Sequence, residues 1–209
     1  RVQKIGRLVD HMAVILPFEA DFYAAHDIPV TFVGHPLLDD HTDYMKDHSE
    51  IPSAANNLIG LLPGSREVEI RRLLPVMLDA AETIHTRDTS LKFIVSVAPT
   101  IDSRMLKAII SERKVTCSVN FCSEPVSRIF PQCRLVVAAS GTVTLQAAIS
   151  GTPMVIIYKV SPISYWLGRA LIRVDHIGLI NLIAGRRLVP ELIQDQASAE
   201  GIAQQVFEL

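Results

Sequence analysis

The sequence predicts an α/β protein with an open parallel sheet that has helices on both faces. The first observation is that apolar runs of strand length alternate with segments of helical periodicity from residue 58 onward. The second is that segment 58–62 (Leu-Ile-Gly-Leu-Leu) is mostly apolar, with the length of a buried parallel strand, and leads into Pro63-Gly64, a turn signal. Strands that alternate with helices in this way form an open parallel sheet.

Residues 1–36 form a short α/β run that is too small to fold as a domain. The pattern predicts a strand, a helix and a second strand over residues 10–17, 19–26 and 30–34. Two strands and one helix bury little apolar surface by themselves. We therefore interpret residues 1–36 as the tail of a preceding domain, and residues 37–57 as a linker to a second domain over 58–209.

The second domain shows a regular alternation of elements. Strands are expected over residues 58–62, 91–97, 115–121, 134–139 and 154–158, and helices over 67–87, 102–113, 126–130, 140–150 and 194–209. The first helix has a one-face apolar stripe from Ile70 to Ile84, and Pro75 is expected to kink or split it. Gly151 stands where a C-terminal glycine is expected to end the helix before it.

Composition and charge exclude several classes of protein. The 209 residues include 20 Lys plus Arg and 22 Asp plus Glu, so the chain lacks the basic excess of a nucleic-acid-binding protein, and we expect no nucleic-acid partner. No apolar run reaches the roughly 18 residues of a membrane-spanning helix. The chain begins at Arg1, without an initiator Met or a signal-peptide core, and we interpret it as a piece of a longer protein.

The cysteines and the acidic linker give no sign of a metal centre. Cys117, Cys122 and Cys133 lack CxxC spacing and lie in apolar or strand-like surroundings, so buried free thiols are expected rather than disulfides or a zinc site. The carboxylates and histidines of residues 37–57 lack the glycine of a calcium loop and a His-x-x-x-His pair. We interpret this segment as a solvated linker and expect no bound metal.

The turn after the first strand of the second domain is a candidate anion site. A helix N-terminus leaves backbone N–H groups without partners and carries partial positive charge, which stabilises a phosphate there. Gly64 lets the backbone approach a ligand closely, Ser65 offers a hydroxyl, and Arg66 offers a fork of donors. The alternative is an ordinary strand-helix turn in which Ser65 caps the helix and Arg66 is solvated.

Other polar residues are expected at the same edge of the sheet, because the carboxyl ends of parallel strands share one edge. Ser140-Gly141-Thr142 forms a second hydroxyl-rich glycine turn, suited to a diphosphate. Gln146 lies one turn into the helix that follows, where its amide can bond a sugar hydroxyl or remain plain surface. Tyr158 and Lys159 follow a further strand. The chain has no three-glycine dinucleotide fingerprint and no phosphate loop ending in lysine, so neither a redox cofactor nor triphosphate hydrolysis is expected.

Several motifs in order resemble one known family. They are segments 61–66 (Leu-Leu-Pro-Gly-Ser-Arg), 139–142 (Ala-Ser-Gly-Thr), 181–186 (Asn-Leu-Ile-Ala-Gly-Arg), 32–36 (Phe-Val-Gly-His-Pro) and 17–19 (Pro-Phe-Glu). Together they resemble lipid-A-disaccharide synthase, a GT-B glycosyltransferase of Gram-negative bacteria. The similarity spans nearly the whole chain, and several ordered motifs are far more specific than any one of them.

The resemblance implies two Rossmann-like domains and transfer of 2,3-diacylglucosamine from its UDP conjugate to 2,3-diacylglucosamine 1-phosphate. Residues 58–209 would then be the C-terminal, UDP-sugar-binding domain of a GT-B enzyme. Arg66 is implied as a diphosphate ligand, Ser140-Gly141-Thr142 as phosphate donors and Asn181 as a polar group of the active site, with no metal and no cofactor. The general base would lie outside this chain, so the chain alone is expected to lack competent catalysis.

Two residues depart from the family pattern. Gln146 stands where GT-B enzymes commonly have a glutamate on the ribose hydroxyls, and Ile180 stands where the family usually has a proline before Asn181. The alternatives are another GT-B enzyme, such as a UDP-N-acetylglucosamine epimerase or the peptidoglycan N-acetylglucosaminyl transferase, and a non-catalytic UDP-sugar-binding module. Turnover, acceptor choice and UDP affinity would separate these alternatives.

Location and assembly are also implied by the resemblance. Segment 162–173 mixes bulky apolar residues with Arg169 and Arg173, which fits either a helix at a membrane interface or one packed on its own sheet. Because the implied substrates carry acyl chains, we expect a cytoplasmic protein associated peripherally with the inner membrane. A homodimer of the full-length form is left open.

Overall fold

The computed structural model describes residues 2–39, 57–113, 115–161 and 176–209. The chain divides into two compact units, Arg1–Ser49 and Glu50–Leu209, and each is described here by itself. Most of the predicted linker and the whole of segment 162–173 lie outside the described residues. The proposed boundaries at residues 36 and 57 therefore stay predictions.

The first unit contains a small parallel pair of strands. Helix α1 (Val2–Gly6) precedes β1 (Met12–Val14), and helix α2 (Pro17–Ala24) lies between β1 and β2 (Val30–Phe32) along the chain. The strands pair in parallel with Met12 opposite Val30. Only Val14 and Ile28 are buried hydrophobic residues among the described part of this unit. The predicted strand-helix-strand order is confirmed, and α1 was not predicted.

The second unit is built on a six-stranded sheet in which every neighbouring pair is parallel, in the order β5-β4-β3-β6-β7-β8. The strands are β3 (Leu58–Leu62), β4 (Lys92–Ser96), β5 (Val119–Cys122), β6 (Leu135–Ala139), β7 (Met154–Tyr158) and β8 (Glu191–Ile193). Counted from β3, this is the 3-2-1-4-5-6 order of a Rossmann fold. The strand order therefore reverses between β3 and β6, which pair directly with Gly60 opposite Val136.

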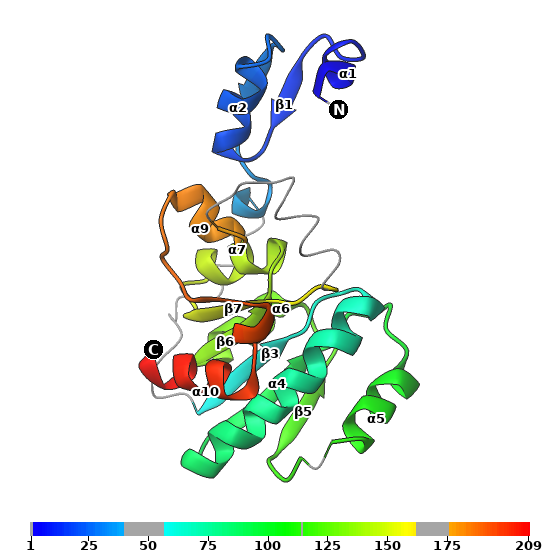
Figure 1. Ribbon diagram of the computed structural model, residues 1–209, viewed down its shortest axis with the longest axis vertical. Helices are drawn as coiled ribbons and strands as arrows, with labels where there is room; N and C mark the ends of the chain where they lie inside the picture. Colours follow the sequence, from blue (N-terminus) through cyan, green and yellow to red (C-terminus); the bar gives the residue numbers. More distant parts are fainter. Residues whose placement is uncertain (1, 40–56, 114, 162–175) are drawn as a thin grey trace. The chain divides into compact units, whose positions relative to one another are not determined.

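Helices cover both faces of this sheet, as predicted (Figure 1). One face carries α4 (Glu67–Arg87), α5 (Ser103–Ser111) and α10 (Ala199–Glu208), and the other carries α6 (Val126–Ile129), α7 (Thr142–Ile149) and α9 (Leu179–Ala184). Two short 3-10 helices, Phe130–Gln132 and Gln194–Gln196, complete the connections. The helix predicted over 194–209 is thus a 3-10 turn followed by α10.

Alternate residues of each strand enter two separate apolar clusters. Leu61 and Val137 pack with α4, α5 and α10, whereas Leu62 and Ala138 pack with α6 and α7 on the opposite face. Because both faces are covered, the central strands β3, β6 and β7 are almost entirely apolar instead of alternating with polar residues. Gly60 allows the second cluster to close, since a Cβ atom there would stand 2.7 Å from Val136 Cγ1.

Two predicted elements differ from the structure. Helix α4 continues through Pro75 as one helix of 21 residues, so the alternative of a split is wrong, whereas the alternative of a kink stays a prediction. Buried residues on both sides of Pro75, Leu74 and Leu78 among them, anchor the helix to the sheet. Strand β5 begins at Val119 and not at residue 115. The backbone N–H groups of Thr116 and Cys117 instead donate to the Glu82 carboxylate of α4, at 2.8 and 3.2 Å.

The cysteines are free, and two of them are buried. Burial raises the pKa of the Cys133 thiol to about 12 and that of Cys117 to about 11, because removal from water disfavours the thiolate. Cys122 is half-buried. Buried free thiols were predicted for all three, and the prediction is confirmed for Cys117 and Cys133.

Candidate functional site

In the turn between β3 and α4, neither the Ser65 hydroxyl nor the Arg66 guanidinium caps the helix. Gly64 has φ +104°, a left-handed conformation that favours glycine, and a Cβ atom there would meet the side chain of Glu69. The N-cap of α4 is Arg66, and its side chain makes no cap hydrogen bond. Ser65 is exposed and has no hydrogen-bond partner within the described residues. The alternative in which Ser65 caps the helix is therefore wrong.

Arg66 is 81% exposed and pairs with Glu69 one turn along the helix, with 2.9 Å between Nη1 and Oε1. An exposed pair of this kind contributes little to stability. A ligand could therefore replace the Glu69 carboxylate as the partner of the Arg66 guanidinium with little loss of stability.

The turn between β6 and α7 is the second predicted site. Gly141 is the N-cap of α7, and its carbonyl accepts the Thr144 hydroxyl at 2.7 Å. The Ser140 hydroxyl donates to the backbone carbonyl of Ile177 at 3.0 Å, which ties this turn to the segment before α9. Thr142 is exposed, and its hydroxyl has no partner among the residues that the structure describes.

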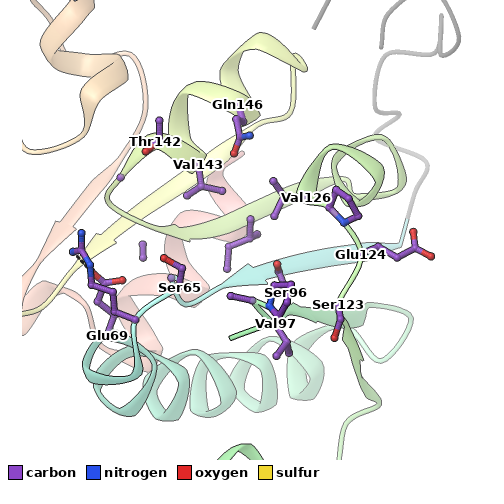
Figure 2. Close-up of a pocket in the computed structure, with 18 of the residues that line it drawn as sticks. Ser65, Glu69, Ser96, Val97, Ser123, Glu124, Val126, Thr142, Val143 and Gln146 are labelled. Atoms are coloured by element: carbon purple, nitrogen blue, oxygen red, sulfur yellow. Dashed lines mark hydrogen bonds and ion pairs between the residues drawn. The ribbon is translucent and has the colours of Figure 1, made fainter. Parts of the chain in front are cut away.

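Both turns open into one cavity of about 470 Å³ at the carboxyl edge of the sheet. Figure 2 shows Ser65 and Glu69 on one side of it and Thr142, Val143 and Gln146 on the other. The cavity lies where the strand order reverses between β3 and β6, which is where open α/β sheets bind their ligands. This first cavity therefore joins two turns that are about 75 residues apart in the sequence.

Backbone and hydroxyl donors dominate the chemistry of the first cavity. Of the described residues that line it, Arg66 is the single cation, and Glu69 and Glu124 are carboxylates. A diphosphate placed there would be stabilised mainly by the N-terminal N–H groups of α4 and α7 and by free hydroxyls. The cavity also has the volume of a small-molecule site.

Most of the predicted site residues line these cavities. Gly64, Ser65, Arg66, Ser140, Gly141, Thr142 and Gln146 all line the first cavity. Tyr158 and Lys159 line a second cavity of about 320 Å³, which shares Arg66, Glu69, Ala139 and Ser140 with the first. The two strand-helix turns and the end of β7 are thus brought together as predicted.

Asn181 lies elsewhere, fully buried in α9. Its Nδ2 group donates to the Val189 carbonyl at 2.9 Å and to Glu191 Oε1 at 2.6 Å, and its Oδ1 atom accepts the N–H groups of Leu188 and Val189. It lines neither cavity. Its position favours a packing role for this side chain over direct ligand contact.

Sequence reasoning missed one wall of the first cavity. Residues 96–99 are the last residue of β4 and the loop after it, and residues 123–126 are the loop after β5 and the first residue of α6. Both segments line the cavity. Figure 2 shows Ser96, Val97 and Ser123 on this wall. The same rule that placed the two glycine turns, applied to the strands predicted over 91–97 and 115–121, would have found these loops.

The described residues contain no group of three or more His, Cys, Asp or Glu side chains placed to hold a metal ion. The expectation that the protein needs no metal remains a prediction. No helix within the described ranges combines the length and apolar character needed to cross a membrane.

Gly141 offers a direct test of the site. A Cβ atom there would meet no atom of the described residues within 4 Å, so Gly141→Ala should leave the unfolding midpoint unchanged. The added methyl would occupy space at the cavity wall, and we expect the Kd for UDP, measured by calorimetry, to rise about tenfold, or about 1.4 kcal/mol. Gly64→Ala is the contrasting variant, because its backbone strain lowers stability as well. Unchanged UDP affinity in Gly141→Ala would contradict this placement of the ligand.

Solved structures with similar folds identify the fold class of the protein. The chain superposes on TarM with a TM-score of 0.56 at 14% identity, which covers 98% of this chain and 37% of that one. It superposes with a TM-score of 0.55 on the UDP-GlcNAc 2-epimerase of Neisseria meningitidis bound to UDP-GlcNAc, at 8% identity, covering 99% of this chain and 62% of that one. The second unit thus has the Rossmann-like fold of the GT-B class.

The sequence comparison is more specific than the fold. A family profile described as lipid-A-disaccharide synthetase matches residues 1–209, and the chain belongs to this family. The lipid-A-disaccharide synthases of Geobacter sulfurreducens and Nitrosococcus oceani are each 43% identical to it, over 99% and 100% of this chain. Each match covers 54% of the relative, so the chain spans about half the length of the curated relatives it matches. The predicted resemblance is confirmed.

Proposed function

We propose that this chain is the donor-binding part of an inverting glycosyltransferase of lipid A biosynthesis. The enzyme would transfer 2,3-diacylglucosamine from its UDP conjugate to 2,3-diacylglucosamine 1-phosphate, giving a β-1,6-linked disaccharide 1-phosphate. The observation that carries the proposal is that two helix N-termini with free hydroxyls, at Ser65 and Thr142, face one cavity at the switch point of the sheet. Membership of the family supplies the substrates.

The site would act mainly on the leaving group. The 6-hydroxyl oxygen of the acceptor attacks the anomeric carbon of the donor, the bond from that carbon to the diphosphate oxygen breaks, and UDP leaves with the electron pair. Negative charge grows on the diphosphate as this bond breaks. Arg66 and the backbone N–H groups at the N-terminus of α7, which begins at Thr142, would stabilise this charge most strongly at that moment. The proton of the acceptor would pass to a carboxylate base outside this chain.

The remaining predicted residues take supporting roles in this proposal. Gln146 lines the first cavity one turn into α7, where its amide can bond a ribose hydroxyl. Asn181 would act as a positioning residue, because it bonds Glu191, whose carboxylate holds Ile177, the partner of Ser140. In this proposal Asn181 thus supports the Ser140 turn without touching the substrate.

Both proposed substrates carry acyl chains and a polar sugar phosphate. We therefore place the reaction at the cytoplasmic surface of the inner membrane, with the protein bound peripherally. Homodimerisation of the complete enzyme remains a further element of the proposal. Co-sedimentation of the protein with anionic lipid vesicles would test the membrane association.

Donor binding is tested by calorimetric titration of this chain with UDP at fixed salt. We expect a Kd in the micromolar range, about −8 kcal/mol, and at least tenfold weaker binding of uridine, which lacks the diphosphate. A folded chain that binds neither ligand would contradict the donor-site assignment. Equal affinity for UDP and uridine would show that the two glycine turns do not hold a diphosphate.

Catalysis is tested in a chimera in which this chain replaces the matching residues of the Geobacter sulfurreducens relative. We expect formation of the acylated disaccharide 1-phosphate from the UDP donor. Turnover only with a non-acylated acceptor would favour another GT-B transferase, and conversion of UDP-N-acetylglucosamine to its epimer would favour an epimerase. UDP affinity without any turnover would favour a binding module.

A further inference from the structure

The second cavity is the more positively charged of the two. It lies beside the first cavity, between the N-terminal turns of α4 and the end of β7, and encloses about 320 Å³. Its charged lining residues are Arg66, Arg72, Lys159 and Glu69. Three cations thus face one carboxylate, whereas the first cavity has one cation and two carboxylates among the described residues. An anionic group carried by a ligand is therefore more strongly attracted to the second cavity.

Among the described residues that line the second cavity, Arg72 is the cation whose guanidinium has no partner to compete with a ligand. Within the described part of the chain its side chain makes no hydrogen bond and no ion pair, and the residue is half-buried. Its neighbour Arg71 lies on the exposed side of α4 and pairs with Glu67, with 2.6 Å between Nη2 and Oε1. The helix therefore turns one guanidinium toward solvent and the next one toward the cavity.

The other cations are partly engaged. Lys159 donates one hydrogen bond from Nζ to the Ala197 carbonyl at 3.3 Å, which leaves two further N–H groups on its ammonium. The carboxylate of the cavity, Glu69, is already paired with Arg66. The excess charge that a ligand meets thus comes from Arg72 and Lys159, which lie on separate elements.

We infer that the second cavity is a phosphate subsite that takes a phosphate monoester while the first cavity holds the donor diphosphate. A monoester has a charge of about −1.5 to −2 at neutral pH, which matches the two uncompensated cations. The inference rests on the proposed function, in which the acceptor is a sugar 1-phosphate. The two cavities share Arg66 and Ser140, so ligands in both would approach each other at this common wall.

The test uses glucosamine 1-phosphate as the probe, titrated into this chain at saturating UDP, with glucosamine as the control that lacks phosphate. We expect the phosphate ester to bind without displacing UDP and glucosamine not to bind. Arg72→Ala should weaken the binding of glucosamine 1-phosphate at least about tenfold. It should leave the Kd for UDP within about twofold of its original value.

Arg71→Ala is the matched control, because it removes the same side chain one residue away, and it should change neither Kd by more than about twofold. Arg72→Lys should restore part of the affinity for glucosamine 1-phosphate, since it restores the charge without the planar fork. A thermal melt of each variant reports whether the fold is intact. Folded Arg72→Ala that binds the probe as tightly as the original chain would overturn the inference.

Two further results separate this inference from the proposed function. If glucosamine 1-phosphate competes with UDP, or if Arg72→Ala weakens UDP binding to the same extent, the second cavity holds a donor phosphate and the inference fails while the donor site stands. If UDP does not bind but glucosamine 1-phosphate still requires Arg72, the phosphate subsite stands and the proposed donor site fails.

Discussion

Replacing Arg66 with alanine should lower the kcat of the chimera by about 10²-fold to 10³-fold, or about 2.7 to 4 kcal/mol. Arg66 is the single cation lining the first cavity among the described residues, and it stands at the N-terminus of α4, where the charge on departing UDP would grow. In the proposed mechanism its stabilising effect would increase as the bond from the anomeric carbon to the diphosphate breaks, so kcat should fall more than the apparent affinity for the donor. Steady-state kinetics with the UDP donor measure both quantities.

Arg71→Ala serves as the control for this substitution, because Arg71 pairs with Glu67 and lines neither cavity. It should keep its turnover. Arg66→Lys should recover only part of the loss, because lysine keeps the charge without the fork of donors. A loss of donor affinity alone, with kcat intact, would show that Arg66 binds ground state and transition state equally and has no part in expelling UDP.

Asn181→Ala should lower the free energy of unfolding by about 2 to 4 kcal/mol. The amide makes four hydrogen bonds inside the fold, and its removal leaves the N–H groups of Leu188 and Val189 without an acceptor. It also takes a donor from the buried carboxylate of Glu191. Urea denaturation followed by circular dichroism measures the change.

The matched control is Asn120→Ala, which makes the same change on the exposed side of β5 and should alter stability by less than about 0.5 kcal/mol. If Asn181→Ala unfolds at the same urea concentration as the original chain yet abolishes turnover, its role is direct contact with the substrate. That result would contradict the positioning role proposed here.

The long elements were predictable because their patterns are local. Strands β3 and β7 were predicted with the bounds that the structure shows, and the stripe of α4 was predicted from its spacing. Strand β8 and helix α9 are three and six residues long, too short for a periodic pattern, and β8 begins with a buried glutamate. Pro75 does not split α4, because buried residues on both sides of it pack against the sheet, and a rule about isolated helices neglects this packing.

The glycine turns of the site could be predicted from the sequence, whereas the roles of Arg72 and Asn181 could not. The glycine turns were predictable, because a strand that ends in a hydroxyl-rich turn before a helix has a local signature. Arg72 had no such signature, because α4 carries several basic residues. Only the three-dimensional structure shows that Arg72, and not Arg71, lies on the side of α4 that faces the end of β7. Asn181 was placed by its motif alone, and a motif does not show whether a side chain meets the ligand or the fold.

The first cavity owes part of its shape to the edge of the sheet. Glu191, the first residue of the edge strand β8, accepts the N–H groups of Ile177 and Gly178, and the Ile177 carbonyl accepts the hydroxyl of Ser140. A three-residue edge strand is among the first parts of a sheet to open by local fluctuation. Each opening would release the anchor of the Ser140 turn. We therefore expect a bound ligand to slow amide hydrogen exchange in β8, a strand that lines neither cavity.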